Sequence, residues 1–226
     1  MTAGHRYFLA RLAQVSDDEL LAPSALPGWT GRHVLSHVGH NARAIRRLAH
    51  WAATGEPTPM YARATSRARE IALGAHWDTA RLRSFVEVEQ DELAAALHRL
   101  HNDHLTTEVV TAQGRHVPAA LLPWLRTREL WIHAVDLHRD ADFSDFPGPL
   151  LDELIVDVLR WRRDVRGEAV RVRPTDRDLT PALDARDPPE WIEGRSCDLA
   201  RWLTGRGGAN LKTSNHSALP TLGPWL

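Results

Sequence analysis

Helical spacing of apolar side chains runs through most of the first 138 residues and sets the fold class. Hydrophobic residues recur every three or four positions along four segments, which is the period of a helix with one buried face. These segments are residues 3–22, 31–54, 78–100 and 118–136. In the last of them, Pro123 is best tolerated in a first turn, so that helix is expected to begin either at 118 or close to the proline. Four such helices predict an up-and-down bundle with one long crossover.

The remaining segments predict a second, smaller domain. Residues 56–76 are irregular apart from a helical turn near 67–73, and residues 106–111 suggest a short extended excursion before a turn at Gln113 and Gly114. A linker is expected at 142–149, followed by a helix at 150–161, strands at 169–172 and 190–193, and a helix at 196–204. The sequence therefore predicts an α+β protein, with a four-helix bundle domain at 1–143 and a small α/β domain at 147–226.

Composition excludes several classes of protein. The formal net charge of the 226 residues is −1, so no global field would recruit nucleic acid or an anionic membrane. Cys197 is the only cysteine, which rules out an intrachain disulfide and a cysteine-rich metal site. No run approaches the ~18 apolar residues of a membrane span, and the N-terminus lacks the apolar core of a signal peptide. We therefore expect a cytoplasmic protein, and a monomer.

Three ionisable residues share one face of the helix predicted at 118–136. Glu129, His133 and Asp136 stand at positions i, i+4 and i+7, among apolar neighbours. Carboxylates turned toward a bundle interior are costly unless they are paired or bind a metal. The alternative is a solvated stripe that carries a Glu–His pair, because an E-x-x-x-H spacing alone is a weak signal.

A third candidate ligand comes from the helix predicted at 31–54. His33, His37 and His40 all lie within one broad face, and His37 is nearest its centre, with the other two as competitors. His37, Glu129 and His133 would form a site with three protein ligands. Such a set leaves a fourth position open, as catalytic zinc requires, although two histidines and a carboxylate can also hold Fe(II).

Two features of the second domain allow more than one interpretation. Cys197 follows Ser196 at a predicted helix start, where a thiolate is favoured, but no partner histidine is evident nearby, so an inert thiol is the preferred interpretation. The run from Gly205 to Gly208 could be a simple helix cap and turn. It could also let the backbone approach a ligand while Arg206 reaches into a site.

Several motifs resemble the mycothiol-dependent maleylpyruvate isomerase family. The first two are LPGWT (26–30) with VLSHV (34–38), and RELWIHAVD (128–136). The likeness extends over nearly the whole chain and is weakest over 1–20 and 140–195. Three further segments are more specific to the isomerase, namely HWAATGEPTPMY (50–61), TAQGR (111–115) and the GRG tail (205–207). This family combines a DinB-like metal-binding bundle with a small C-terminal α/β domain.

The resemblance implies a role for six residues. It makes His37, Glu129 and His133 ligands of zinc or another divalent metal. It also implies that Arg67, Asp136 and Arg206 are polar residues of the active site, and that Arg206 contacts the cofactor. The sequence shows no departure from the family at these six positions.

The activity implied by the resemblance is a cis–trans isomerisation that uses mycothiol as cofactor, converting maleylpyruvate to fumarylpyruvate in gentisate breakdown. A zinc-bound thiolate would add to the alkene carbon beta to the ketone, the adduct would rotate about the new single bond, and elimination would return the thiol. The substrate is a small dicarboxylate, for which forked guanidinium groups are natural partners. The alternatives are a DinB-like mycothiol S-transferase, which would consume the thiol, and a metal-binding module without turnover.

Overall fold

The chain divides into two compact units, Met1–Ala141 and Asp142–Leu226, which are described separately below. The computed structural model describes residues 1–137, 140–179, 181, 187–223 and 225. Among these residues, no helix is both long enough and apolar enough to span a lipid bilayer.

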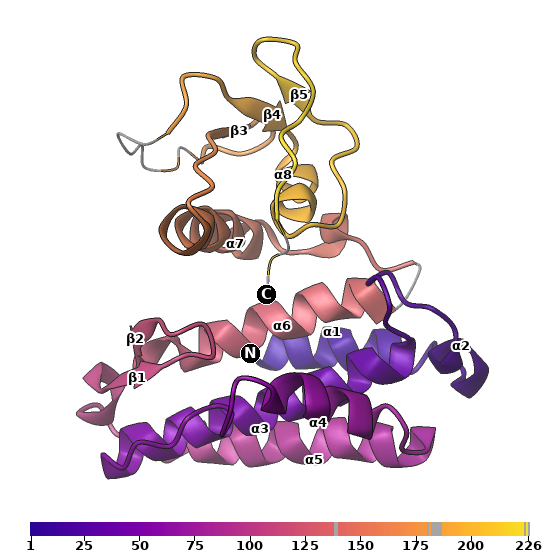
Figure 1. Cartoon of the computed structure of the whole chain (residues 1–226), viewed down its shortest axis with the longest axis vertical. Helices are drawn as coiled ribbons and strands as arrows, with labels where there is room; N and C mark the ends of the chain where they lie inside the picture. The colour runs from indigo at the N-terminus through magenta and orange to yellow at the C-terminus, as the bar shows by residue number, and fades with distance from the viewer. Residues whose placement is uncertain (138–139, 180, 182–186, 224, 226) are drawn as a thin grey trace. The chain divides into compact units, whose positions relative to one another are not determined.

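The first unit is a bundle of four main helices, α1 (Thr2–Leu12), α3 (Gly31–Thr54), α5 (Thr79–His98) and α6 (Leu122–Leu137). Helix α3 packs against both α5 and α6, and α1 packs along α6 (Figure 1). This arrangement confirms the predicted bundle. Helix α6 begins one residue before Pro123, as the proline requires, and a short 3-10 turn (Ala119–Leu121) precedes it.

Two clusters of buried apolar side chains fill the bundle, and a layer of polar residues lies between them. Along α3, α5 and α6 the two clusters are separated at Asn41, Gln90 and Arg126, which we call the polar layer. One cluster contains Phe8, Leu12, Leu20, Val34, Leu35, Val38, Leu82, Val86, Leu130 and Ala134. The other contains Ala42, Ile45, Leu48, Leu93, Val109, Val117, Leu122 and Leu125.

The prediction of one continuous helix over 3–22 is wrong. Helix α1 ends at Leu12, and a separate short helix, α2, runs over Asp17–Leu21. Ser16 explains the break, because its hydroxyl accepts a hydrogen bond from the Glu19 backbone while the Glu19 carboxylate accepts from the Ser16 backbone. This reciprocal capping box starts a new helix and redirects the chain.

Two connections in the first unit are more regular than the sequence predicted. The turn expected near 67–73 is a nine-residue helix, α4 (Ser66–Gly74), held on α3 by the Ser36 hydroxyl, which donates to the Ile71 carbonyl at 2.9 Å. The extended excursion is one strand of an antiparallel hairpin, β1 (Glu108–Val110) and β2 (His116–Pro118). A 3-10 turn at His104–Thr106 precedes this hairpin.

The second unit is a small α/β structure, as predicted. It contains α7 (Gly148–Trp161), α8 (Ser196–Leu203) and a three-stranded sheet of β3 (Val172–Pro174), β4 (Ile192–Gly194) and β5 (Lys212–Thr213). Strand β4 is central, with β3 parallel and β5 antiparallel to it. A 3-10 turn (Phe143–Asp145) precedes α7, and a π-helical turn (Arg162–Arg166) follows it. Strand β3 begins three residues later than predicted, and β5 had no counterpart in the sequence prediction.

A fully buried arginine organises the interior of the second unit. The Arg162 side chain has no exposed surface and donates to the carbonyl oxygens of Leu203, at 2.6 and 2.8 Å, and of Gly223, at 3.2 Å. It also pairs with the Glu168 carboxylate. These contacts satisfy the buried guanidinium and join the end of α8 to the C-terminal segment.

Candidate metal centre

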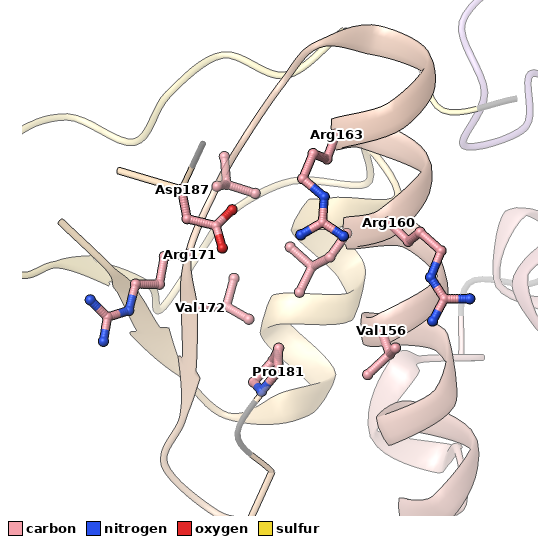
Figure 2. Close-up of a pocket in the computed structure, with 9 residues that line it drawn as sticks. Val156, Arg160, Arg163, Arg171, Val172, Pro181 and Asp187 are labelled. Atoms are coloured by element: carbon pink, nitrogen blue, oxygen red, sulfur yellow. The ribbon is translucent and has the colours of Figure 1, made fainter. Parts of the chain in front are cut away.

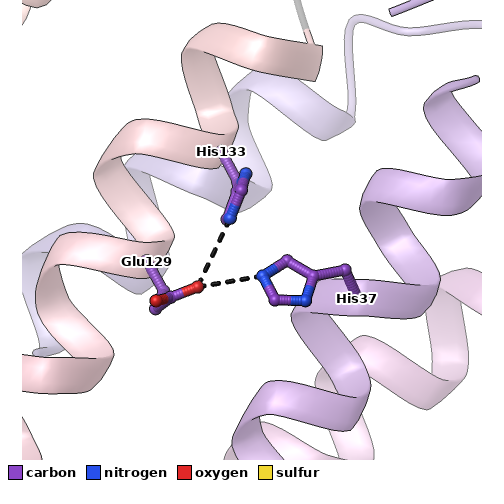
Figure 3. A group of neighbouring side chains, drawn as sticks. All are labelled: His37, Glu129 and His133. Atoms are coloured by element: carbon purple, nitrogen blue, oxygen red, sulfur yellow. Dashed lines mark hydrogen bonds and ion pairs between the residues drawn. The ribbon is translucent and has the colours of Figure 1, made fainter. Parts of the chain in front are cut away.

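Two histidines and a glutamate meet inside the bundle, from helices far apart in the sequence (Figure 3). His37 Nε2, on α3, lies 3.0 Å from Glu129 Oε2, on α6. His133 Nε2 lies 3.3 Å from the same oxygen. One potential ligand atom from each residue lies within 4.8 Å of the others. All three residues are at most 9% exposed.

Local helix geometry accounts for two of the three positions. Glu129 and His133 are one turn apart on α6, so their side chains project from the same face. His37 comes to them because α3 packs against α6, an arrangement set by the apolar clusters on either side of the polar layer. The structure thus brings together the three residues that the sequence analysis selected.

Asp136 fixes the orientation of His133. Its carboxylate Oδ2 lies 2.8 Å from His133 Nδ1, and the Asp136 side chain is completely buried. A carboxylate that accepts the Nδ1–H of an imidazole fixes the orientation of the ring. Here Nε2 is the nitrogen that faces Glu129.

The electrostatics of this cluster are those of a buried carboxylate between two imidazoles. Burial lowers the pKa of His37 to about 4, with His133 adding to the shift, so the His37 ring is neutral at pH 7. Burial alone would raise the pKa of Glu129, but hydrogen bonds from His133 and His37 hold it well below its usual range. Burial also opposes a charge on His133, yet its bonds to Asp136 and Glu129 raise the pKa of that ring.

The donor set fits a divalent metal ion. It offers two imidazoles and one ionised carboxylate, the combination found in catalytic zinc sites with three protein ligands. The buried Nδ1 of His37 has no hydrogen-bond partner among the described residues, so neither of its ring nitrogens is fixed by a contact outside the cluster. The second carboxylate, Asp136, supplies the support that metal-binding histidines ordinarily have.

The two competing histidines of α3 have other surroundings. His33 Nδ1 lies 2.9 Å from the Thr30 hydroxyl and accepts from the Thr30 backbone at 3.2 Å, so this residue caps the start of α3. His40 packs edge-on against Phe85, and its Nδ1 lies 3.3 Å from the Glu70 carboxylate. Neither belongs to the group of potential ligands found among the described residues.

Three further side chains of the first unit act on this cluster. Arg67, on α4, exerts an electrostatic effect that lowers the pKa of His37, and it acts in the same direction on Tyr61. Burial raises the pKa of Tyr61 to about 12, and Glu129 contributes to that rise, so Tyr61 carries a neutral phenol. Trp29 meets the His37 ring edge-on at 5.6 Å between centroids. The sequence predicted Arg67 as a site residue and Trp29 as a neighbour of the site, whereas Tyr61 occurred only within a motif.

Comparison with known proteins identifies the family. The family profile described as the mycothiol maleylpyruvate isomerase N-terminal domain matches residues 1–138, more than half of the chain. The chain belongs to this family. Two solved structures also match, the crystal structure of the mycothiol-dependent maleylpyruvate isomerase and that of its histidine-to-alanine mutant. Each solved chain is 33% identical to this one and superposes on it with a TM-score of 0.86. The match covers 99% of this chain and 93% of the solved chain. A search of curated proteins found no match.

Arg206, the remaining predicted site residue, lies in the second unit of this member of the maleylpyruvate isomerase family. It follows α8, and its guanidinium donates to the Thr204 carbonyl at 2.5 Å. Gly205 and Gly207, on either side, have φ angles of 82° and 102°, which only glycine adopts without strain. The Gly205–Gly208 segment is therefore a glycine-rich turn in which Arg206 lies between two glycines.

The one thiol of this family member is unsuited to nucleophilic attack. Cys197 is 3% exposed, and burial, followed by the charge of Asp198, raises the pKa of its thiol. It lines a cavity of about 420 Å³ in the second unit, together with Arg195, Asp198 and Arg201. A buried thiol with a raised pKa stays protonated near neutral pH and is a weak nucleophile.

We expect Cys197 to be dispensable for turnover. The Cys197→Ser variant should keep most of the wild-type turnover, because the nucleophile expected from the sequence is the thiol of a cofactor. Steady-state kinetics beside a thermal melt separate a catalytic loss from a stability loss. A variant that keeps its fold and its metal but loses turnover would restore the nucleophilic interpretation of Cys197.

A smaller cavity of the second unit is lined by arginine and apolar side chains. It lies between α7 and the β3 region, and the residues that line it include Arg160, Arg163, Arg171, Val156 and Val172 (Figure 2). Its volume is about 70 Å³. We assign no ligand to it.

Proposed function

We propose that this protein is a mycothiol-dependent maleylpyruvate isomerase, which converts maleylpyruvate to fumarylpyruvate in gentisate breakdown. The observation that carries the proposal is the match to the solved maleylpyruvate isomerase over 99% of the chain at 33% identity. The buried cluster of His37, Glu129 and His133 supports it independently, because it supplies the open metal site that a thiol-dependent reaction of this kind uses.

In this proposal His37, Glu129 and His133 hold zinc or another divalent metal. When bound, zinc would keep the mycothiol sulfur as a thiolate near neutral pH. Reversible addition of this nucleophile would convert the C=C bond to a single bond, about which the adduct can rotate. Asp136 keeps the His133 ring oriented through its contact with Nδ1. All three ligands are buried, and charge interactions are stronger in a buried site than in bulk water.

The two arginines hold the substrate in this proposal. Maleylpyruvate carries two carboxylates, and a guanidinium grips a carboxylate with two parallel hydrogen bonds. Arg67 already acts on the His37 ring through its charge, which favours a role for it beside the metal. Negative charge also develops on the ketone oxygen during addition, and a nearby guanidinium stabilises it. Arg206 would supply the second cation and contact the cofactor.

We also propose that the protein is cytoplasmic and monomeric, as predicted from the sequence. Its partners are then two small molecules, a dicarboxylate and a low-molecular-weight thiol. Neither nucleic acid nor a membrane is involved.

One assay tests the proposal. Purified zinc-loaded protein is mixed with maleylpyruvate, with and without mycothiol, and the reaction is followed by ultraviolet absorbance while free thiol is titrated. We expect turnover only when mycothiol is present, with the thiol concentration unchanged at the end. Consumption of one thiol per substrate would point instead to an S-transferase, and no reaction with mycothiol present would refute the isomerase.

A further inference from the structure

Arg126 is a fully buried arginine in the middle of the bundle. It has no exposed surface, and it forms the polar layer together with Asn41 and Gln90. Its Nε donates to Gln90 Oε1 on α5 at 2.8 Å. Its Nη1 donates to the Val38 carbonyl at 2.8 Å and to Asn41 Oδ1 at 2.9 Å, both on α3. One side chain of α6 thus bonds to both neighbouring helices.

None of these acceptors carries a charge. They are one backbone carbonyl and two side-chain amides, and Nη2 has no hydrogen-bond partner among the described residues. Burial lowers the pKa of Arg126 to about 10, while Glu129 acts to raise it, so the group remains a cation at pH 7. A buried cation without a direct ion pair costs several kcal/mol, and an apolar side chain between the two apolar clusters would avoid that cost.

The position of Arg126 relates this cost to the metal centre. It precedes Glu129 by three residues on α6, which places both on one face of the helix. Its acceptor Val38 is the residue directly after His37 on α3. The hydrogen bond from Arg126 to the Val38 carbonyl therefore joins the two ligand-bearing helices within one turn of the ligands. The Arg126 cation also interacts with the Glu129 carboxylate.

We propose that Arg126 is a positioning residue for the metal centre. It holds α3 and α6 at the spacing that brings His37 to Glu129. The inference rests on the proposed metal site. It adds to that proposal a residue that contacts neither metal nor substrate. A preformed donor set binds a metal more tightly than one that must be assembled on binding.

Zinc affinity of the full-length chain tests the inference. Competition with a chromogenic zinc chelator would be measured for the wild type, Arg126→Met and Arg126→Lys. We expect Arg126→Met to weaken zinc binding by about 10- to 100-fold, the range for residues that support metal ligands. Arg126→Lys keeps the charge but cannot bond to both neighbouring helices as a guanidinium does. Its zinc affinity should therefore lie between those of the wild type and Arg126→Met. Cobalt absorption spectra would show whether the ligand geometry changes.

Two controls separate positioning from stability. Gln90→Leu removes the α5 acceptor but keeps the α3–α6 connection, so zinc affinity should not change. Arg162→Met removes an equally buried arginine from the second unit, so it should lower the melting temperature and leave zinc affinity unchanged.

Several outcomes would contradict the inference. If Arg126→Met folds and binds zinc with wild-type affinity, the inference is wrong. If Arg126→Met does not fold, Arg126→Lys decides, and a wild-type zinc affinity with an unchanged cobalt spectrum in that variant would contradict the inference. A wild-type chain that binds no zinc, or a His37→Ala chain that binds it normally, refutes the proposed metal site itself.

Discussion

Replacing His37 with alanine should leave a folded protein that holds almost no zinc and has no isomerase activity. His37 is the only one of the three proposed ligands that comes from α3. Without it, Glu129 and His133 remain as two ligands on a single helix, too few for a stable zinc site. The apolar clusters of the bundle do not depend on the His37 side chain. Metal content after zinc loading and desalting, with far-ultraviolet circular dichroism, measures both properties.

His33→Ala is the matched control for this variant. His33 lies on the same helix and caps its N-terminus through Thr30, so its loss should reduce stability, by about 1 kcal/mol as for other caps, and leave one zinc per chain. If His37→Ala retained full zinc occupancy, the site would have to move to another histidine of α3, and His40→Ala would then decide which.

Replacing Arg206 with lysine should reduce kcat/KM by about 10- to 100-fold while zinc content stays unchanged. Lysine keeps the positive charge but cannot make the two parallel hydrogen bonds of a guanidinium. One lost hydrogen bond to a charged group costs about 1.5–3 kcal/mol, which gives the expected factor. Steady-state kinetics over a range of maleylpyruvate concentrations, at saturating mycothiol, measure the loss.

Arg195→Lys is the control for the Arg206 variant. It is the same substitution in the same unit, at a side chain that is 65% exposed, and it should leave kinetics unchanged. A chain that ends near Ser144 gives a second test, because it lacks Arg206 altogether. If that shorter chain isomerised maleylpyruvate as well as the full chain, the proposed role of Arg206 would be wrong.

Most of the bundle could be predicted because its helices carry a strong period of apolar residues. The break between α1 and α2 was missed because the hydrophobic spacing continues through it, and only the pairing of Ser16 with Glu19 marks a new helix. The second unit was harder, since its strands have two or three residues each. Strands so short show no alternation of apolar and polar side chains, and tertiary contacts decide where they pair.

The candidate site was predicted unevenly for a similar reason. The spacing of Glu129 and His133 on one helix is visible in the sequence, whereas the choice of His37 among three histidines depends on how α3 packs against α6. The spacing of Arg126 from Glu129 is also visible in the sequence. That signal is weak, because an arginine three residues from a glutamate on a helix is usually a surface pair.

The distribution of donors over α3 and α6 makes metal uptake and folding thermodynamically linked. Glu129 and His133 keep their spacing in any chain that forms α6, but His37 joins them only when the bundle is packed. A metal held by all three therefore binds the folded state far better than the unfolded state. At a free zinc concentration 100 times the Kd, such binding stabilises the folded state by about 2.7 kcal/mol. The first unit would thus become more resistant to heat and to proteolysis as zinc becomes available.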